Sequence, residues 1–125
     1  MEPDRPKVLV IEDDPLIARV MQRVLAAEFD VTVTQEGQSA IGLMRRQFFA
    51  AVVTDVMMPG LTGLDVFKTL RMDNPLQASR VVFVTGCAWA EDLDDQLRET
   101  GRPVLEKPFS FAALSEIVRQ CAINP

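Results

Sequence analysis

Residues 8–15 read Val-Leu-Val-Ile-Glu-Asp-Asp-Pro: four apolar residues, three acidic residues and a proline. Because the apolar run is continuous and does not alternate with polar residues, it predicts a strand that is buried on both faces of a parallel sheet. Asp14 can cap a helix, and Pro15 fits the first turn of that helix. The segment therefore predicts a strand, an acidic turn and the beginning of a helix.

More apolar runs follow along the chain, at residues 31–33, 51–53, 81–84 and, more briefly, 104–105. The stretches between them have the periodicity of amphipathic helices. The first helix has two adjacent apolar rows, which consist of Leu16, Val20 and Val24 beside Ile17, Met21 and Leu25. The apolar positions of the other expected helices are Ile41, Met44 and Phe48; Leu64, Phe67 and Leu70; Leu93 and Leu97, within residues 90–99; and Leu114, Ile117, Val118 and Cys121.

Strands that alternate with helices in this way predict an α/β fold, a doubly wound parallel sheet with helices on both faces. The length of 125 residues suits one domain and is too short for two. We expect residues 1–6, with two prolines and mixed charge, to form a flexible leader. Residues 7–122 are expected to form the domain, and residues 123–125 a short tail.

Polar residues stand just after the apolar runs, and open parallel sheets bind ligands beyond the carboxyl ends of their strands. Glu12 and Asp13 follow the first run, Asp55 the third, Thr85 the fourth and Lys107 the fifth. No comparable group follows the second run. This pattern places the second strand at one edge and the first strand beside the third, as in the flavodoxin-like order 2-1-3-4-5.

In such a sheet the carboxylates of Glu12, Asp13 and Asp55 converge, and each close pair repels by roughly 1–4 kcal/mol. Either their pKa values rise or a cation lies among them. Oxygen ligands without a thiolate or an imidazole select Mg²⁺, for which Mn²⁺ could substitute. Lys107 can meet the remaining negative charge and Thr85 offers a hydroxyl donor. These are the groups that phosphoryl transfer onto a carboxylate needs.

The composition excludes several classes of function. The net charge is −5 and the 13 Lys and Arg residues are scattered, so no basic stripe is available for direct nucleic-acid binding. No stretch approaches the roughly 18 consecutive apolar residues of a membrane span, and residues 1–6 lack the apolar core of a signal peptide. We therefore expect a cytoplasmic protein without membrane insertion. The absence of histidine excludes a His-based triad, a His-ligated metal and an internal phosphohistidine.

The two cysteines, Cys87 and Cys121, lack the spacing of a CxxC or zinc-finger site. Their apolar surroundings predict reduced, packed thiols. Cys87 and Trp89 lie in the loop after Thr85, where they are candidates for the border of the pocket or for contact with a partner.

Four segments resemble the signature segments of receiver domains in two-component signalling: residues 8–15, 54–60 (Thr-Asp-Val-Met-Met-Pro-Gly), 84–86 (Val-Thr-Gly) and 106–109 (Glu-Lys-Pro-Phe). They stand in the family's order, each at a strand end, and the resemblance spans about residues 7–121. Residues 103–109 are also similar to the receiver segments of hybrid histidine kinases. The resemblance implies a domain that takes a phosphoryl group from the phosphohistidine of a histidine kinase or histidine phosphotransfer protein and then switches protein–protein contacts.

The resemblance also implies which residues hold the metal and the phosphoryl group. Asp55 resembles the phosphoacceptor. Asp13 resembles the direct Mg²⁺ ligand, and Glu12 the carboxylate that holds the metal mainly through water. Met57 would contribute its backbone carbonyl oxygen to the metal.

The remaining signature residues concern charge and switching. Lys107 resembles the lysine that pairs with the acceptor carboxylate and later with the phosphoryl oxygens, and its bond to Pro108 is expected to be cis. Thr85 resembles the switch hydroxyl that moves toward the phosphoryl group. Many relatives have an aromatic residue three positions before the lysine, where this chain has Val104 and contains no tyrosine. The usual threonine–aromatic switch is therefore in doubt, whereas the phosphorylation chemistry is expected to survive.

Taken singly, these residues have simpler interpretations: residues 12–14 as a solvated helix cap, and Asp55 as a turn residue. Jointly, their agreement at four strand ends favours a phosphoacceptor site. A pseudo-receiver that binds partners without phosphorylation is the first alternative, and Val104 favours it. A metal-dependent phosphohydrolase is the second, which the lack of a substrate-binding insertion disfavours. We expect a signalling domain that catalyses only its own phosphorylation and dephosphorylation, as a monomer or weak dimer.

Overall fold

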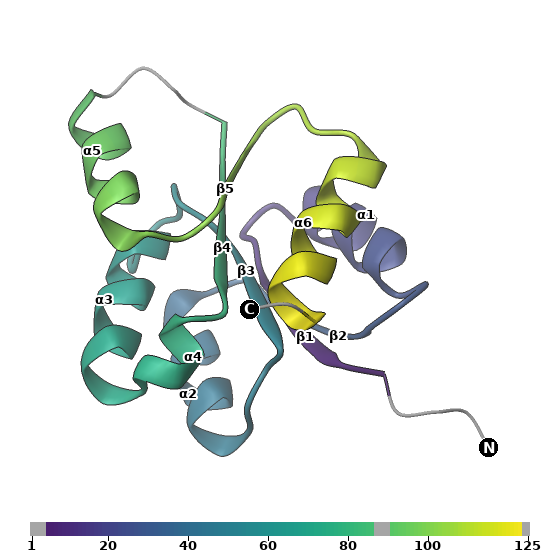
Figure 1. The fold of residues 1–125 in the computed structure, drawn as a ribbon, viewed down its shortest axis with the longest axis horizontal. Coiled ribbons are helices and arrows are strands. Elements are labelled where there is room, and N and C mark those ends of the chain that lie inside the picture. The colour runs from purple at the N-terminus through teal and green to yellow at the C-terminus, as the bar shows by residue number, and fades with distance from the viewer. Residues whose placement is uncertain (1–4, 87–90, 124–125) are drawn as a thin grey trace.

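A five-stranded parallel sheet in the order β2-β1-β3-β4-β5 lies at the centre of the molecule (Figure 1). The computed structural model describes residues 5–86 and 91–123. The strands are β1 (Lys7–Ile11), β2 (Asp30–Thr34), β3 (Ala51–Asp55), β4 (Val81–Thr85) and β5 (Val104–Glu106). The helices are α1 (Pro15–Leu25), α2 (Gly37–Arg46), α3 (Gly63–Asp73), α4 (Pro75–Ala78), α5 (Glu91–Thr100) and α6 (Phe111–Ile123). This single α/β domain has the predicted flavodoxin-like strand order.

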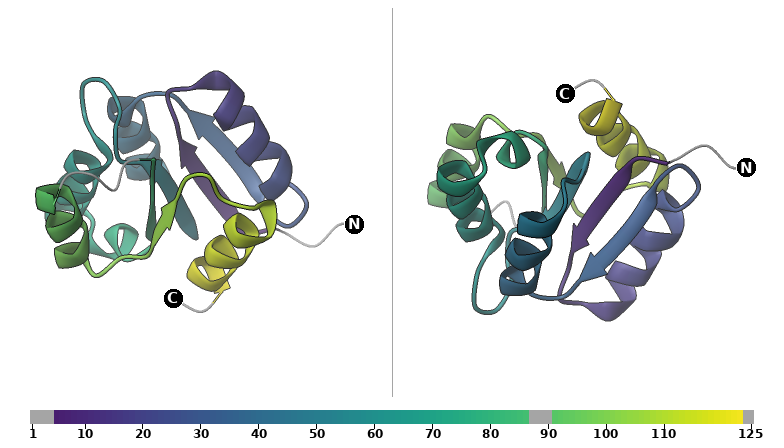
Figure 2. Two further views of the ribbon diagram at one scale, coloured as in Figure 1. Left: turned by 90° about the horizontal axis from the view of Figure 1, so that it is seen from above. Right: turned by 90° about the horizontal axis from the view of Figure 1, so that it is seen from below.

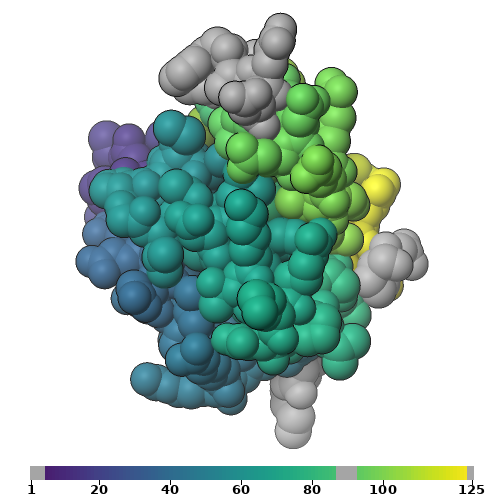
Figure 3. All heavy atoms as spheres, turned by 90° about the vertical axis from the view of Figure 1, so that its left-hand side faces the viewer, coloured from purple at the N-terminus to yellow at the C-terminus, as the bar shows by residue number. Residues whose placement is uncertain are grey.

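Helices cover both faces of the sheet, which explains why its strands are continuously apolar. One face packs against α1 and α6, and the other against α2, α3, α4 and α5 (Figures 1 and 2). Alternate residues of β1 serve the two cores: Val8 and Val10 face α1 and α6, whereas Leu9 and Ile11 face the other layer. All four side chains are fully buried. Figure 3 shows the second layer from outside, where α3 and α5 (teal to green) form much of the surface.

The predicted start of the first helix is confirmed. Oδ1 of Asp14 accepts a hydrogen bond from the backbone N–H of Leu16 at 2.9 Å, and Pro15 occupies the first turn of α1. Among the described residues, no helix is both long enough and apolar enough to cross a membrane.

Only one of the two apolar rows predicted for the first helix is buried. Met21 and Leu25 pack into the core, but Leu16 is 73% exposed and Val20 is 42% exposed. The row that contains Leu16 and Val20 therefore lies largely in solvent, and only its last member, Val24, packs partly against the core. A helix can turn only one stripe toward a sheet, and here the helix buries the row containing Met21.

Two further differences concern α2 and α4. Phe48 does not belong to a helical row, because α2 ends at Arg46 and Phe48 is about half exposed, while the next residue, Phe49, is fully buried. The four-residue helix α4 was not predicted, since it is too short to show a helical period. It is fixed by Gln77, whose buried side chain bonds both the backbone N–H and the backbone carbonyl of Phe49 at 2.8 Å.

Candidate functional site

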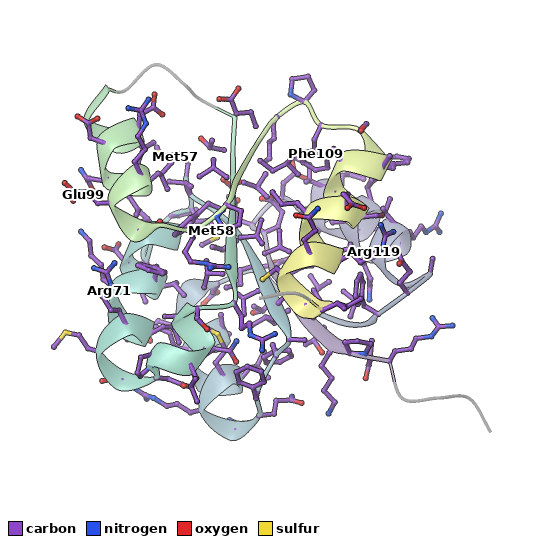
Figure 4. The ribbon with its side chains drawn as sticks, in the orientation of Figure 1. Met57, Met58, Arg71, Glu99, Phe109 and Arg119 are labelled. Carbon is purple, nitrogen blue, oxygen red and sulfur yellow. The ribbon has the colours of Figure 1, made fainter. Side chains whose placement is uncertain are left out.

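The carboxyl ends of β1, β3, β4 and β5 lie side by side and carry the predicted site residues. The register pairs Ile11 of β1 with Thr54 of β3, and Thr85 of β4 with Glu106 of β5. Asp55 and Thr85 are the last residues of their strands, rather than the first residues after them. In Figure 4, Met57 and Phe109, which follow β3 and β5, lie on the same upper side of the molecule.

Three carboxylates meet at this edge, as the sequence predicts. One oxygen each from Glu12, Asp13 and Asp55 lies within 4.8 Å of the others. Glu12 is only 2% exposed and Asp55 8%, so the negative charges of both are poorly solvated. A cluster of this kind favours a cation or a raised pKa.

Lys107 supplies positive charge to the cluster. Its Nζ atom lies 3.1 Å from Oε1 of Glu12 and 3.1 Å from Oδ2 of Asp55. The backbone N–H of Lys107 donates to the carbonyl of Thr85 at 2.8 Å, which fixes the start of the segment after β5 to the end of β4. The Lys107–Pro108 peptide bond is cis, as predicted.

The electrostatics of the site follow from burial and from these ion pairs. Burial raises the pKa of the Glu12 carboxyl to about 7; the charge of Asp55 acts in the same direction, and hydrogen bonds from Lys107 and the N–H of Asp14 oppose it. Burial by itself would lower the pKa of Lys107, but its hydrogen bonds to Glu12 and Asp55 outweigh that effect and raise its pKa. Lys107 therefore stays charged, while Glu12 titrates near neutral pH.

Backbone groups orient the acidic side chains. Oδ1 of Asp55 accepts from the N–H of Met57 at 3.1 Å, which leaves Oδ2 directed at Lys107. Oε2 of Glu12 accepts from the N–H of Asp14 at 3.2 Å, while its other oxygen bonds the lysine. The carboxylates are thus held by the local backbone on one side and by a cation on the other.

Comparison with known proteins agrees with this geometry. Residues 8–119 match the family model of the response regulator receiver domain. The chain belongs to the response regulator receiver domain family. Among its relatives, TcrX of Mycobacterium tuberculosis, named as a probable transcriptional regulatory protein, is 38% identical over 105 residues, which are 83% of this chain and 44% of TcrX. The chemotaxis protein CheY-3 of Vibrio cholerae is 30% identical over 113 residues, 88% of this chain and 86% of CheY-3.

Solved structures show the same fold. The receiver domain of Francisella response regulator 1452 aligns with a TM-score of 0.82 at 30% identity, over 94% of this chain and 97% of that one. A sensor protein from Polaromonas sp. JS666 aligns with a TM-score of 0.84 at 27% identity, over 96% of this chain and 98% of that one. This receiver domain spans less than half the length of TcrX and about half the length of the DNA-binding response regulator MtrA.

The candidate metal ligands of this site suit the predicted Mg²⁺. Glu12, Asp13 and Asp55 offer only hard carboxylate oxygens, the ligands that Mg²⁺ prefers. Burial of Glu12 and Asp55 with a single lysine leaves excess negative charge that a divalent ion would neutralise. The role of the Met57 carbonyl as a ligand stays a prediction.

Thr85 is 3% exposed, at the end of the strand next to Asp55. Its role as a switch hydroxyl stays a prediction.

Val104, at the start of β5, is 37% exposed. It borders a cleft of about 210 Å³ between α5 and β5, with Asp94, Leu97, Arg98, Arg102 and Glu106. The aliphatic side chain therefore leaves space beside β5. Cys87 and Trp89, the candidates for the border of the pocket, lie outside the described residues.

An apolar groove beside Lys107 was not foreseen from the sequence. It has a volume of about 600 Å³ and lies between α1 and the segment that follows β5. Its lining, here called the α1 groove, includes Leu16, Val20, Lys107, Pro108, Phe109 and Phe111. The exposed fractions are 73% for Leu16 and 60% for Phe111. The signal in the sequence was the second apolar row on the first helix, which exceeds what one buried face requires.

Proposed function

We propose that this receiver domain accepts a phosphoryl group on Asp55 from a phosphohistidine of a partner protein, in a Mg²⁺-dependent reaction. The observation that carries the proposal is the position of Lys107, 3.1 Å from Oδ2 of an aspartate that shares a carboxylate cluster with Glu12 and Asp13. Phosphoryl transfer depends mainly on positioning and on neutralising the charge of the phosphoryl oxygens. A lysine and a cation-binding cluster around one carboxylate supply both.

The metal would be held by Glu12, Asp13, Asp55 and the backbone carbonyl of Met57. When bound, Mg²⁺ supplies positive charge that neutralises the oxygens of the transferring group, and Mn²⁺ could substitute. Glu12 carries a negative charge only when it is ionised, and burial raises its pKa to about 7. The cluster therefore couples metal binding to loss of a proton from Glu12.

The reaction forms one bond to phosphorus and breaks another. A carboxylate oxygen of Asp55 attacks the phosphorus and forms the new O–P bond, while the N–P bond to the partner's histidine breaks and its electron pair stays on the imidazole. The ammonium of Lys107 pairs with the phosphoryl oxygens and remains anchored by Glu12. In this proposal the chain is a signalling domain that catalyses only its own phosphorylation and dephosphorylation.

Phosphorylation would add roughly −1.5 to −2 charge next to Thr85, by analogy with other phosphorylated side chains. We expect the Thr85 hydroxyl to be drawn toward this charge and to shift an existing equilibrium between two conformations of the surface formed by α5, β5 and α6. Val104 replaces the aromatic residue of many relatives on that surface. The conformational signal would therefore travel through the backbone of β4 and β5 rather than through an aromatic side chain.

The donor would be a histidine kinase or a histidine phosphotransfer protein that docks on the α1 groove. Asp55 is 8% exposed, so a phosphohistidine can reach it only if the partner covers the rim of the site. Lys107 belongs both to that rim and to the wall of the groove, so the apolar side chains of Leu16 and Phe111 lie next to the point of transfer. A partner surface with exposed apolar side chains fits this groove.

The test uses acetyl phosphate as a small donor, with Mg²⁺ present or removed by chelation. Wild type should incorporate one phosphoryl group per chain only with the metal, and Asp55→Asn should incorporate none. Equal labelling of the two proteins would refute the site. No Mg²⁺-dependent labelling of a folded wild type would instead support the pseudo-receiver, the alternative that Val104 favours. Turnover beyond one equivalent of a small phosphate ester would indicate a phosphohydrolase.

A further inference from the structure

Gly63 makes an unusually close backbone contact with the proposed phosphoacceptor. It is the first residue of α3, and its N–H donates to the carbonyl of Val56 at 3.1 Å. A Cβ atom on Gly63 would lie 2.5 Å from the carbonyl oxygen of Asp55 and 3.1 Å from Cα of Val56. Both neighbours are backbone atoms, so no flexible side chain could swing away to relieve the overlap.

The peptide that Gly63 touches is confined from its other sides as well. The carbonyl oxygen of Asp55 accepts from the hydroxyl of Thr54 at 3.0 Å, and the N–H of Val56 donates to the carbonyl of Val84 in β4 at 3.0 Å. The next residue, Met57, donates its N–H to Oδ1 of Asp55. A shift of this peptide would therefore move the acceptor carboxylate relative to Glu12 and Lys107.

The beginning of α3 is itself rigidly built. Thr62 and Asp65 form a capping box, in which Oγ1 of Thr62 accepts from the N–H of Asp65 at 3.2 Å and Oδ2 of Asp65 accepts from the N–H of Thr62 at 3.0 Å. Such a cap holds the first turn of a helix in one geometry. The peptide between Asp55 and Val56 thus packs against a helix turn whose geometry is fixed by its cap.

We infer that Gly63 is a positioning residue for the phosphorylation site. Because Gly63 has no side chain, the capped start of α3 packs directly against the backbone of Asp55 and fixes its carboxylate within the cluster with Glu12 and Asp13. The inference rests on the proposed function, because it takes Glu12, Asp13 and Asp55 to be the metal site. It concerns neither a metal ligand nor a group that touches the phosphoryl donor. Gly63 would act only through the place it gives to Asp55.

The test compares Gly63→Ala with Gly42→Ala, and no phosphodonor is needed. At Gly42, in α2, a Cβ would meet nothing within 4 Å, so this variant makes the same chemical change away from the start of α3 and from Asp55. Mg²⁺ affinity is measured by calorimetry, and amide resonances of the metal-free proteins by NMR. We expect Gly63→Ala to weaken Mg²⁺ binding at least tenfold and to shift the amides of Asp55 and Met57. Gly42→Ala should bind Mg²⁺ within twofold of wild type.

A folded Gly63→Ala variant with Mg²⁺ affinity within twofold of wild type would overturn the inference, as would an equal loss in Gly42→Ala. If Gly63→Ala does not fold, Thr62→Ala decides, because it loosens the same helix start without adding atoms. Weakening of Mg²⁺ binding by threefold or more supports the inference, and unchanged binding contradicts it. A wild type that binds Mg²⁺ but cannot be labelled on Asp55 would defeat the proposed function alone.

Discussion

The ammonium of Lys107 is anchored to Glu12 by an ion pair of 3.1 Å that does not involve the phosphoacceptor. Glu12 follows β1 and Lys107 follows β5, so this ion pair joins segments that are 95 residues apart in the chain. When Asp55 is phosphorylated, its carboxyl group loses the negative charge that pairs with the lysine, but the ion pair with Glu12 remains. The lysine is therefore held in place to meet the oxygens of a newly transferred phosphoryl group.

Replacement of this lysine tests that role. We expect Lys107→Ala to be labelled by acetyl phosphate about 10- to 100-fold more slowly than wild type, because it lacks one charge-stabilising group but retains the metal-binding carboxylates. It should also lose the response of the α5–β5–α6 surface, read from the amide resonances of Val104 and Leu105 after phosphorylation. Lys7→Ala is the matched control, since Lys7 is exposed and its ammonium donates to the side chain of Gln47 at 3.0 Å, away from the carboxylate cluster. A normal response in Lys107→Ala would contradict the assignment.

The raised pKa of Glu12 predicts how the stability of the metal-free domain depends on pH. Between the ordinary pKa of 4.5 and about 7, the folded state keeps the Glu12 proton while the unfolded chain loses it. Stability therefore falls as pH rises through this window, by up to about 3 kcal/mol from this group. The measurement is urea unfolding at a series of pH values, for wild type and Glu12→Gln.

The difference between the two unfolding curves isolates Glu12 from all other titrating groups. Glu12→Gln cannot ionise at this position, so it should lack the decline that wild type shows between pH 4.5 and about 7. Saturating Mg²⁺ should weaken the decline in wild type, since the bound ion favours the ionised carboxylate. Parallel pH profiles for wild type and Glu12→Gln would show that Glu12 titrates like an exposed glutamate.

The strand order and the meeting of the polar residues could be predicted because both depend on simple rules. Runs such as Val8–Ile11 are apolar throughout only when a sheet is covered twice, and parallel strands deliver Glu12, Asp55 and Lys107 to one edge. The exposed row of α1 could not be predicted in the same way. Periodicity shows that Leu16 and Met21 lie on apolar stripes, but not which stripe the sheet covers.

Close contacts were equally beyond the reach of the sequence. That Gly63 touches the carbonyl of Asp55 depends on the path of the chain after β3, which no local pattern encodes. The short helix α4 is fixed by a tertiary interaction, the pairing of Gln77 with the backbone of Phe49. A lone glutamine between apolar residues gives no sign of such a partner.

This glutamine provides a stability prediction that is independent of the site. Gln77 is fully buried and satisfies both backbone groups of Phe49 at 2.8 Å. Gln77→Leu keeps a similar volume but leaves a buried N–H and a buried carbonyl unpaired, so it should lower the free energy of unfolding by about 3 kcal/mol. Gln120→Ala, on the exposed side of α6, should change it by less than about 0.5 kcal/mol. Equal effects in urea unfolding would mean that Phe49 finds other partners.

The α1 groove gives a prediction that separates recognition from chemistry. Leu16 is 73% exposed on the groove wall, and it takes no part in the proposed chemistry at Asp55. Leu16→Glu would place a carboxylate in an apolar contact surface, where an unpaired charge is costly to desolvate. Transfer from an autophosphorylated histidine kinase that labels wild type should therefore slow at least tenfold. Labelling by acetyl phosphate, which needs no docking surface, should stay within twofold of wild type.

Met72→Glu is the control for this comparison, because Met72 is 86% exposed on α3, in the helical layer on the other face of the sheet. It should leave both reactions within twofold of wild type, since it introduces the same charge away from the groove. If Leu16→Glu slows the small donor as much as the kinase, the substitution has disturbed the site itself. If it slows neither, the kinase approaches Asp55 without covering Leu16, and the groove has another use. Selective loss of transfer from the protein donor alone is the outcome that a docking surface requires, because only that reaction buries the rim around Lys107.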